Sequence, residues 1–429
     1  MKPLERIFHI LAFSLQCGAV VSLLLRSAVD KNSLGESNPI NTVATAAVMA
    51  VVLVLTLRHA KTILRYTSGM LPILGVAILA IVSTAWSDYP DITVRRAASL
   101  MTTTMWAVYV TARFDLKDVI AIIRQAITLM ALGSLALGIV APNLGQDDPM
   151  GPPGWQGLFA TKNDLGIIVA LGTVTYFYAL LDHPRLFRFL VYLAGLLLCL
   201  GLLYLSQSRT CWLIGLLGPL LCLAIRLTHK RIGVAIIIWT TMVLLLAPTV
   251  VVVTDELRTI TALLGKDPQL TGRVDLWLTL PSFIAERPWL GYGLGGFWVT
   301  DSPNVALVWG AINWNPPHAH NGWLDLLLEL GIAGLTLLTV QLVMIIVKGI
   351  RAIVDGSEPD AQYVLVMTFL ALVYNLVESS LARPGAMWVL LVVAATALAK
   401  IAKQQRAAAR PGFVSRFPRR APAVSSRLG

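Results

Sequence analysis

The chain has 429 residues, of which 56% are hydrophobic and only 13% are charged. Soluble domains carry about 25% charged residues, so this composition excludes an ordinary soluble protein and indicates an all-α, polytopic membrane protein. The formal net charge is +11, but the basic residues fall at the ends of apolar segments and in the tail. We therefore predict contacts with anionic membrane lipid and no binding of nucleic acid.

Apolar windows of about 20 residues, the length that crosses a bilayer core about 30 Å thick, recur along nearly the whole chain. We predict transmembrane helices 1 to 9 within residues 1–253 and helices 10 to 12 within residues 321–400. One large loop, residues 254–320, separates the two groups, and a basic, disordered tail is predicted over residues 401–429. The windows are residues 7–25, 40–57, 69–86, 97–112, 119–140, 164–181, 189–205, 211–226, 232–253, 321–347, 361–380 and 384–400.

Two further features of the sequence concern orientation and thiols. If the amino terminus is cytoplasmic, most of the 34 lysines and arginines lie on the inner side, so the positive-inside rule predicts that both termini are cytoplasmic. The four cysteines lie within or beside apolar segments and form no C-x-x-C pair, which predicts buried thiols without a redox or metal role. They are Cys17, Cys199, Cys211 and Cys222.

The first polar segment of interest, Thr-Lys-Asn-Asp-Leu-Gly at residues 161–166, closes an outer loop that is rich in proline and glycine. Lys162 and Asn163 in this segment are candidates for contacts with a substrate. The alternative is that Asn163 or Asp164 simply caps the following helix.

The second segment, Ser-Gln-Ser-Arg-Thr at residues 206–210, is a polar notch between two apolar helices. A cation in such a place usually has a partner or a task, and the guanidinium of Arg209 is suited to bind phosphate oxygens through two hydrogen bonds. The alternative is a membrane anchor that extends toward the headgroups.

The third segment is the large loop. Val274, Trp277 and Leu278 have near-helical spacing, which predicts an interfacial amphipathic helix over residues 272–286 with a tryptophan anchor. Arg273 lies at the start of this helix, where free N–H groups and a guanidinium form an anion site.

Arg273 could instead be a surface charge that is paired with Asp275 or Asp267.

The three outer segments, at residues 161–166, 206–210 and in the large loop, can meet in space.

The large loop ends in a polar stretch, His-Ala-His-Asn at residues 318–321, that continues directly into a long apolar helix. An imidazole has an unperturbed pKa of about 6.5, so His320 is a candidate general base at the mouth of a span. The alternatives are that His320 only caps the helix, or that His318 is the active imidazole. Two histidines without a third positioned His or Cys make a poor metal site, so no metal is predicted.

Residues 320–334 resemble the signature of the O-antigen ligase and polymerase superfamily. That signature is a His, then Asn, Ser or Gln, then nine residues, a Gly, two residues, and Gly, Thr or Tyr. Here His320-Asn321, Gly331 and Gly334 occupy these positions without a gap.

The resemblance implies a membrane glycosyltransferase of the bacterial inner membrane with a periplasmic active site. Its donor would be a glycan linked to undecaprenyl diphosphate, and its acceptor a sugar hydroxyl of a glycan or of lipid A core. Direct attack by the acceptor, with the base on the opposite face, predicts inversion at the anomeric carbon, and arginines in place of a divalent cation predict that no cofactor is needed. The resemblance assigns catalysis to His320, Arg209 and Arg273, and substrate binding to Lys162, Asn163, Asn321 and His318.

The superfamily includes enzymes that polymerise repeat units, enzymes that ligate a finished glycan to lipid A core and enzymes that attach glycans to protein, and the resemblance does not separate these activities. The segment Lys162-Asn163 and Gly166 resembles a Lys-Asn-x-x-Gly segment of exopolysaccharide polymerases, so we favour repeat-unit polymerisation over ligation to lipid A core. A transporter of lipid-linked glycan with twelve spans is the alternative from another class. It is disfavoured because the large loop follows the ninth span instead of dividing the chain into two six-span halves.

Three carboxylates lie inside predicted spans, where charges are rarely without function. The sequence allows several partners for them. The helical rotation between His320 and either Asp325 or Glu329 argues against these two as the group that orients His320. The possible pairs are Asp325 or Glu329 with Arg209 or Lys162, and Glu378 with Arg383 or Arg124.

Overall fold

The computed structural model describes residues 2–19, 39–146, 154–182, 185–228, 271–312, 314–356 and 360–408. In these ranges the protein is all-helical, as predicted, with one isolated β-bridge between Gln146 and Trp155. The helices are α1 (Pro3–Gln16), α3 (Pro39–Arg58), α4 (Ala60–Leu64), α5 (Leu71–Val82), α6 (Pro90–Arg113), α7 (Leu116–Val140), α8 (Pro142–Gly145), α9 (Lys162–Leu181), α10 (Leu186–Ser206), α11 (Arg209–Thr228), α13 (Thr271–Glu286), α14 (Pro303–Ala311), α15 (Gly322–Val354), α16 (Ala361–Tyr374) and α17 (Ala386–Ala408).

Six of the described helices are long and apolar enough to cross a membrane, namely α7, α9, α10, α11, α15 and α17. Shorter apolar helices occupy residues 43–58, 71–85 and 361–374. The predicted window at residues 232–253 lies outside the described residues. The count of twelve spans, like the periplasmic placement of the large loop, therefore remains a prediction.

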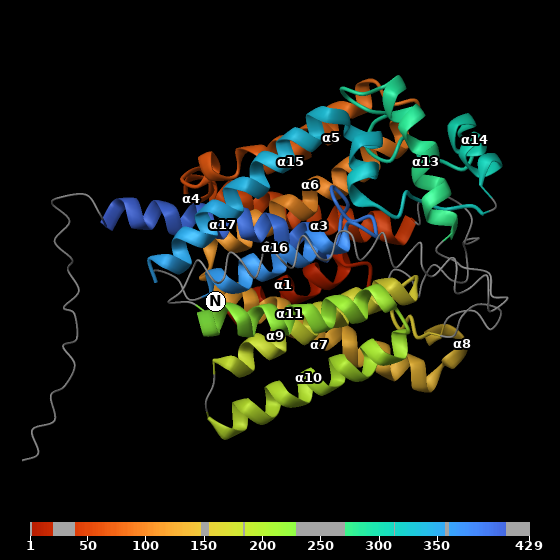
Figure 1. Cartoon of the computed structure of the whole chain (residues 1–429). Helices are drawn as coiled ribbons and strands as arrows, with labels where there is room; N and C mark the ends of the chain where they lie inside the picture. The colour runs from red at the N-terminus through yellow and green to blue at the C-terminus, as the bar shows by residue number, and fades with distance from the viewer. Residues whose placement is uncertain are drawn as a thin grey trace, which may run out of the picture.

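The long helices form a bundle in which segments from both halves of the chain are neighbours (Figure 1). Helix α9 packs against α10 and α11, α5 packs against α15, and α17 packs against α6 and α16. Helix α10 carries exposed leucine and phenylalanine side chains along its outer face, including Leu186, Phe187 and Leu197. An apolar face of this kind is stable in contact with membrane lipid. The three cysteines of α10 and α11 are buried, as predicted, and Cys17 is partly buried.

The residues before α15 form a separate apolar cluster at one end of the bundle, where Figure 1 shows α13 and α14. Leu276 and Leu280 of α13 pack there with Phe297 and Trp298 of the connecting loop and Val308 of α14. The helix predicted over residues 272–286 is confirmed as α13. Its Trp277, which we expected to anchor the helix at a membrane surface, donates its indole N–H to Ala319 O at 2.8 Å.

Helix α15 is broken at Gly331, the first glycine of the signature, which has φ +62° and ψ −163°. The loop after α13 bonds to the backbone groups that the break frees. Tyr292 N donates to Leu328 O at 2.8 Å, and Ile332 N donates to Pro288 O at 2.8 Å. The break at the signature glycine therefore allows the large loop to bond to the backbone of α15, the helix that begins just after His320.

Replacing Gly331 by alanine is expected to lower the free energy of unfolding by about 2 kcal/mol, because only glycine adopts this backbone conformation without strain. An added Cβ would also lie 2.4 Å from the carbonyl of Trp289. Thermal unfolding of the detergent-purified protein measures the loss. Gly201→Ala, in α10 where a Cβ meets nothing within 4 Å, is the control and should gain about 1 kcal/mol. Equal stability of the two variants would contradict this account.

Two boundaries near the carboxyl terminus differ from the prediction. Helix α16 ends at Tyr374 and not at residue 380, so Glu378 lies in the loop that follows α16 and not in a span. Helix α17 continues to Ala408, beyond the predicted end at residue 400. The loop between α16 and α17 brings polar residues to the same end of the bundle as α13, and the rest of the tail lies outside the described residues.

Candidate active site

Glu378 is the centre of a polar cluster at this end of the bundle. Its Oε2 lies 3.3 Å from His320 Nδ1, and its Oε1 accepts a hydrogen bond from Arg273 Nη2 at 3.2 Å. Arg273 Nη1 also donates to Val377 O at 2.7 Å, so the guanidinium is held by two neighbouring residues. One carboxylate thus joins the predicted base to one of the two predicted arginines.

The same carboxylate reaches the start of α9. Asn163 Nδ2 donates to Glu378 Oε1 at 3.1 Å, and Asn163 Oδ1 accepts from Ser208 Oγ at 2.8 Å. Ser208 immediately precedes Arg209, the first residue of α11. The expectation that the three outer segments meet is therefore confirmed, with Asn163 as the link to the Arg209 segment.

The helix cap that we considered as the alternative role of residues 161–166 is formed by Thr161 and not by Asn163 or Asp164. Thr161 is the N-cap of α9, and its side chain accepts from Asp164 N at 3.2 Å. This leaves the amide of Asn163 available for its two contacts across the cluster. Lys162 is the first residue of the helix.

Arg209 is placed beside this cluster but is not part of it. Its side chain is exposed, and it forms no hydrogen bond or ion pair with the residues that the structure describes. Exposed guanidinium donors are able to bind an anionic ligand. The structure thus brings Arg273, Asn163 and His320 together through Glu378. Arg209 is connected to them only through its chain neighbour Ser208, which bonds to Asn163.

The backbone of His320 has an unusual conformation that its neighbours support. It is left-handed, with φ +48°, which is uncommon for residues other than glycine. Its N–H donates to His318 Nδ1 at 3.1 Å, and the two imidazole centroids are 4.1 Å apart. Such conformations cluster at functional sites because the surrounding structure must maintain them.

Asn321, which the sequence suggested as a substrate contact, has a structural task. It is the N-cap of α15, and its Oδ1 accepts from Trp323 N at 3.0 Å and from Leu324 N at 3.2 Å. Its backbone N–H donates to Ser379 Oγ at 3.2 Å. The loop that carries Glu378 therefore also holds the start of α15, which fixes the imidazole relative to the carboxylate.

The two carboxylates of α15 have partners other than those proposed from the sequence. Arg383 Nη2 lies 3.1 Å from Asp325 Oδ2 and 3.1 Å from Glu329 Oε1, so neither pairs with Arg209 or Lys162. Asp325 Oδ1 accepts from Trp298 Nε1 at 2.7 Å and from Ala319 N at 3.1 Å. Asp325 does not orient the imidazole of His320 directly, but it holds the peptide that precedes it.

The suggestion that Glu378 faces Arg383 or Arg124 is likewise wrong. Glu378 contacts Arg273 and His320, while Arg383 pairs with the carboxylates of α15. The guanidinium of Arg124 lies over the ring of Tyr192, 4.7 Å from its centroid. Sequence reasoning placed Glu378 inside a helix, and that error concealed its role.

A signal for Glu378 was nevertheless present. The run Glu-Ser-Ser at residues 378–380 is followed by Arg-Pro-Gly at residues 383–385, and proline with glycine ends a helix more readily than it continues one. An interruption of the apolar window at this point would have exposed the carboxylate as a loop residue.

The cluster changes the proton affinity of two of its members. Burial would raise the pKa of Glu378, but the adjacent imidazole of His320 and the charge of Arg273 outweigh it and lower the pKa from 4.5 to about 2. Burial, with the neighbouring His320, lowers the pKa of His318 well below 6.5. At neutral pH the cluster therefore contains an ionised Glu378 and a neutral His318.

These pKa values predict how stability depends on pH. Below pH 6.5 the unfolded chain binds a proton at His318 that the folded chain does not, so stability falls as the pH is lowered. Protonation of Glu378 causes a second decrease in the free energy of unfolding as the pH falls from 4.5 to about 2. This second decrease amounts to about 3 kcal/mol.

Thermal unfolding at a series of pH values tests the second loss. The difference between the wild type and Glu378→Gln should be constant near neutral pH and shrink below pH 4.5. Parallel curves for the two proteins down to pH 3 would show that the carboxylate is not held as an anion.

The sequence argument against a metal rested on the lack of a third ligand, and the structure supplies one. Ligand atoms of His318, His320 and Glu378 lie within 4.8 Å of one another. However, Oε1 of Glu378 already accepts from Arg273 and Asn163. A guanidinium this close also disfavours a divalent cation by charge repulsion, so the set fits a metal poorly.

Comparison with known proteins identifies similar sequences. Residues 194–339 match the O-antigen ligase family, a segment that contains Arg209, Arg273 and His320. The exopolysaccharide production protein ExoQ of Rhizobium meliloti (strain 1021) is 25% identical over 338 residues, which cover 76% of this chain and 75% of ExoQ. These matches confirm the resemblance found in the signature: the chain is a membrane protein that carries an O-antigen ligase domain.

Proposed function

We propose that the protein transfers a glycan from undecaprenyl diphosphate to a sugar hydroxyl at the periplasmic face of the bacterial inner membrane. The observation that carries the proposal is the convergence of His320, Arg273 and Asn163 on Glu378. An imidazole beside a carboxylate provides a base, and a guanidinium beside that base provides a site for the leaving diphosphate.

In this proposal Glu378 orients His320. Glu378 Oε2 lies 3.3 Å from Nδ1, so we place the ring proton on Nδ1, which leaves Nε2 to accept a proton. The acceptor hydroxyl gives its proton to Nε2 as its oxygen attacks the anomeric carbon. The bond from that carbon to the diphosphate oxygen breaks, and undecaprenyl diphosphate leaves. Direct attack from the opposite face inverts the anomeric centre.

The negative charge that develops on the leaving group needs partners. Arg273 uses only part of its five N–H donors on Val377 and Glu378, and Arg209 is exposed beside the cluster. Two guanidinium groups serve the purpose for which many enzymes use a divalent cation. We therefore propose a metal-independent reaction that EDTA does not inhibit.

ExoQ is named an exopolysaccharide production protein. We propose by analogy that this chain also acts in exopolysaccharide production, and that it polymerises repeat units instead of ligating a glycan to lipid A core. Both reactions use the same donor chemistry and differ in the acceptor. The proposal therefore specifies the acceptor as a second lipid-linked repeat unit.

Reconstitution in vesicles tests the proposal. Purified protein is supplied with an undecaprenyl-diphosphate-linked repeat unit, alone and with lipid A core. A ladder of longer glycans and release of undecaprenyl diphosphate are expected with the donor alone. Product only in the presence of lipid A core would indicate ligation. Movement of intact donor across the bilayer without any new glycosidic bond would indicate a transporter and contradict the proposal.

A further inference from the structure

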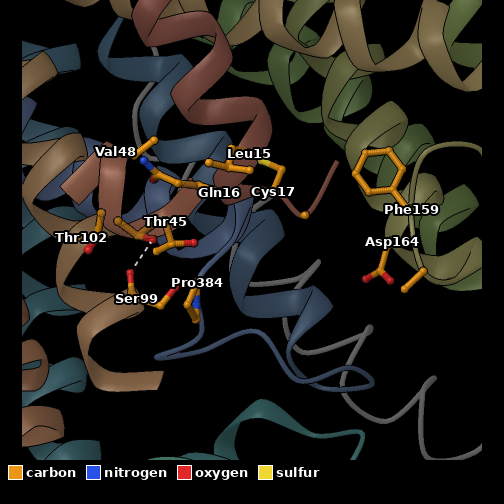
Figure 2. A pocket seen from close by; sticks show the side chains of 13 residues that line it. Leu15, Gln16, Cys17, Thr45, Val48, Ser99, Thr102, Phe159, Asp164 and Pro384 are labelled. Atoms are coloured by element: carbon orange, nitrogen blue, oxygen red, sulfur yellow. Dashed lines mark hydrogen bonds between the residues drawn. The ribbon is translucent and has the colours of Figure 1, made fainter. Parts of the chain in front are cut away.

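A cavity of about 340 Å³ lies where the end of α1, α3 and α6 face the segment that leads into α9. Figure 2 shows Gln16, Thr45 and Ser99 on one side of it, and Phe159 and Asp164 on the other. The volume falls within the range of about 300–1,000 Å³ that is usual for sites that bind small molecules. It is therefore large enough for a small ligand.

Two residues that line the cavity directly follow residues of the candidate active site in the chain, so the cavity adjoins that site. Asp164 follows Asn163, which bonds to Glu378. Pro384, which also lines the cavity, follows Arg383, which pairs with Asp325. A group bound in the cavity would lie beside the reacting centre without occupying it.

Among the residues that the structure describes, the lining of the cavity is a mixture of polar and apolar side chains and contains no lysine or arginine. The hydroxyls of Thr102 and Thr103, two of the lining residues, already donate to carbonyls of their own helix at 2.8 Å and 2.9 Å, so neither offers a free donor to a ligand. The carboxylate of Asp164 is kept in place by Thr161 Oγ1, which donates to its Oδ2 at 2.8 Å. A lining that offers a carboxylate and no cation is unsuited to a phosphate.

Gln16 provides the second observation that points to a ligand. Both the nitrogen and the oxygen of its side-chain amide are buried, and neither has a hydrogen-bond partner among the residues that the structure describes. Buried amides without partners are rare and destabilising. Each of the two atoms exposes less than 1 Å², so the side chain has to turn toward the cavity before a ligand that offers both donors and acceptors completes them. An acyl chain would leave the amide of Gln16 without partners.

We propose that this cavity binds one sugar unit of a substrate glycan, which deepens the proposed function and rests on it. Sugar hydroxyls both donate and accept, as the amide of Gln16 requires, and pairs of hydroxyls bond well to a carboxylate such as Asp164. The ring of Phe159 provides an apolar surface for the C–H face of the sugar. Either the acceptor or the donor glycan could supply this sugar.

Gln16→Leu is the most informative test, because it removes only an amide that has no partner among the described residues. The variant should fold as stably as the wild type in thermal unfolding. Binding is measured by calorimetry with oligosaccharides released by partial acid hydrolysis of the host's own surface polysaccharide. We expect affinity to fall about five- to tenfold in Gln16→Leu and to be lost in Ser99→Phe, which fills the cavity. Gln404→Leu, at an exposed position near the end of α17, is the matched control and should bind as the wild type does.

These oligosaccharides lack a diphosphate, so their binding does not depend on the catalytic residues. His320→Asn should therefore bind them normally even though its glycan transfer is strongly reduced, and this separates failure of the sugar site from failure of the proposed reaction. In the transfer assay, a raised KM for acceptor or for donor in Gln16→Leu identifies which glycan supplies the sugar. Undetectable binding to the wild type, or unchanged binding and KM in Gln16→Leu and Ser99→Phe, would overturn the proposal.

Discussion

Replacing His320 by alanine or asparagine is expected to reduce glycan transfer by about 10²- to 10⁴-fold, the usual contribution of a positioned general base. Neither side chain accepts a proton at neutral pH. The asparagine variant is the more informative, because His320 has φ +48° and asparagine tolerates this left-handed conformation well. Its amount in the membrane should equal that of the wild type, so that the loss is attributed to chemistry. Transfer is measured as glycan product per mole of purified protein.

His318→Asn distinguishes the two imidazoles. His318 accepts the backbone N–H of His320 at 3.1 Å, so its loss removes one hydrogen bond that supports the loop. We expect no more than about a tenfold decrease in transfer. A larger loss in His318→Asn than in His320→Asn would reverse the assignment and make His318 the base.

Sequence analysis predicted those parts of the protein that depend on local pattern. Apolar windows located the long helices, and the spacing from His320 to Gly331 and Gly334 identified the family signature. Gly331 shows why the signature is informative. Its backbone conformation is one that other residues avoid, so a glycine there is required by the attachment of the large loop.

Contacts between distant segments could not be predicted in the same way. Glu378 is 58 residues from His320 and 105 residues from Arg273, and no local pattern links them. Its placement in a span also followed from hydropathy, which averages over about 19 residues and does not detect a short polar loop. Pairing of buried charges depends on three-dimensional packing, which is why Asp325 and Glu329 were given the wrong partners.

Arg383→Met is expected to lower the free energy of unfolding by about 3–5 kcal/mol, because it leaves the carboxylates of Asp325 and Glu329 buried without their shared cation. Their side chains are only 2% and 3% exposed. Thermal unfolding in detergent measures the loss. Arg124→Met is the matched control. Arg124 lies over the ring of Tyr192, and its loss should cost about 1 kcal/mol.

Neutralising the two carboxylates should restore most of that stability. In the triple variant Arg383→Met, Asp325→Asn, Glu329→Gln, both carboxylates become neutral amides, and the amide introduced by Asp325→Asn keeps an oxygen that can accept from Trp298 and from Ala319 N. The buried guanidinium of Arg96, which also interacts with both carboxylates in the wild type, keeps its charge, so a part of the loss remains. Because the Ala319 peptide precedes His320, rescue of the fold should bring partial rescue of transfer. If the triple variant is as unstable as Arg383→Met, the ion pairs do not explain the role of Arg383. If it folds but remains inactive, the charge of Asp325, and not only its hydrogen bonds, is needed to position His320.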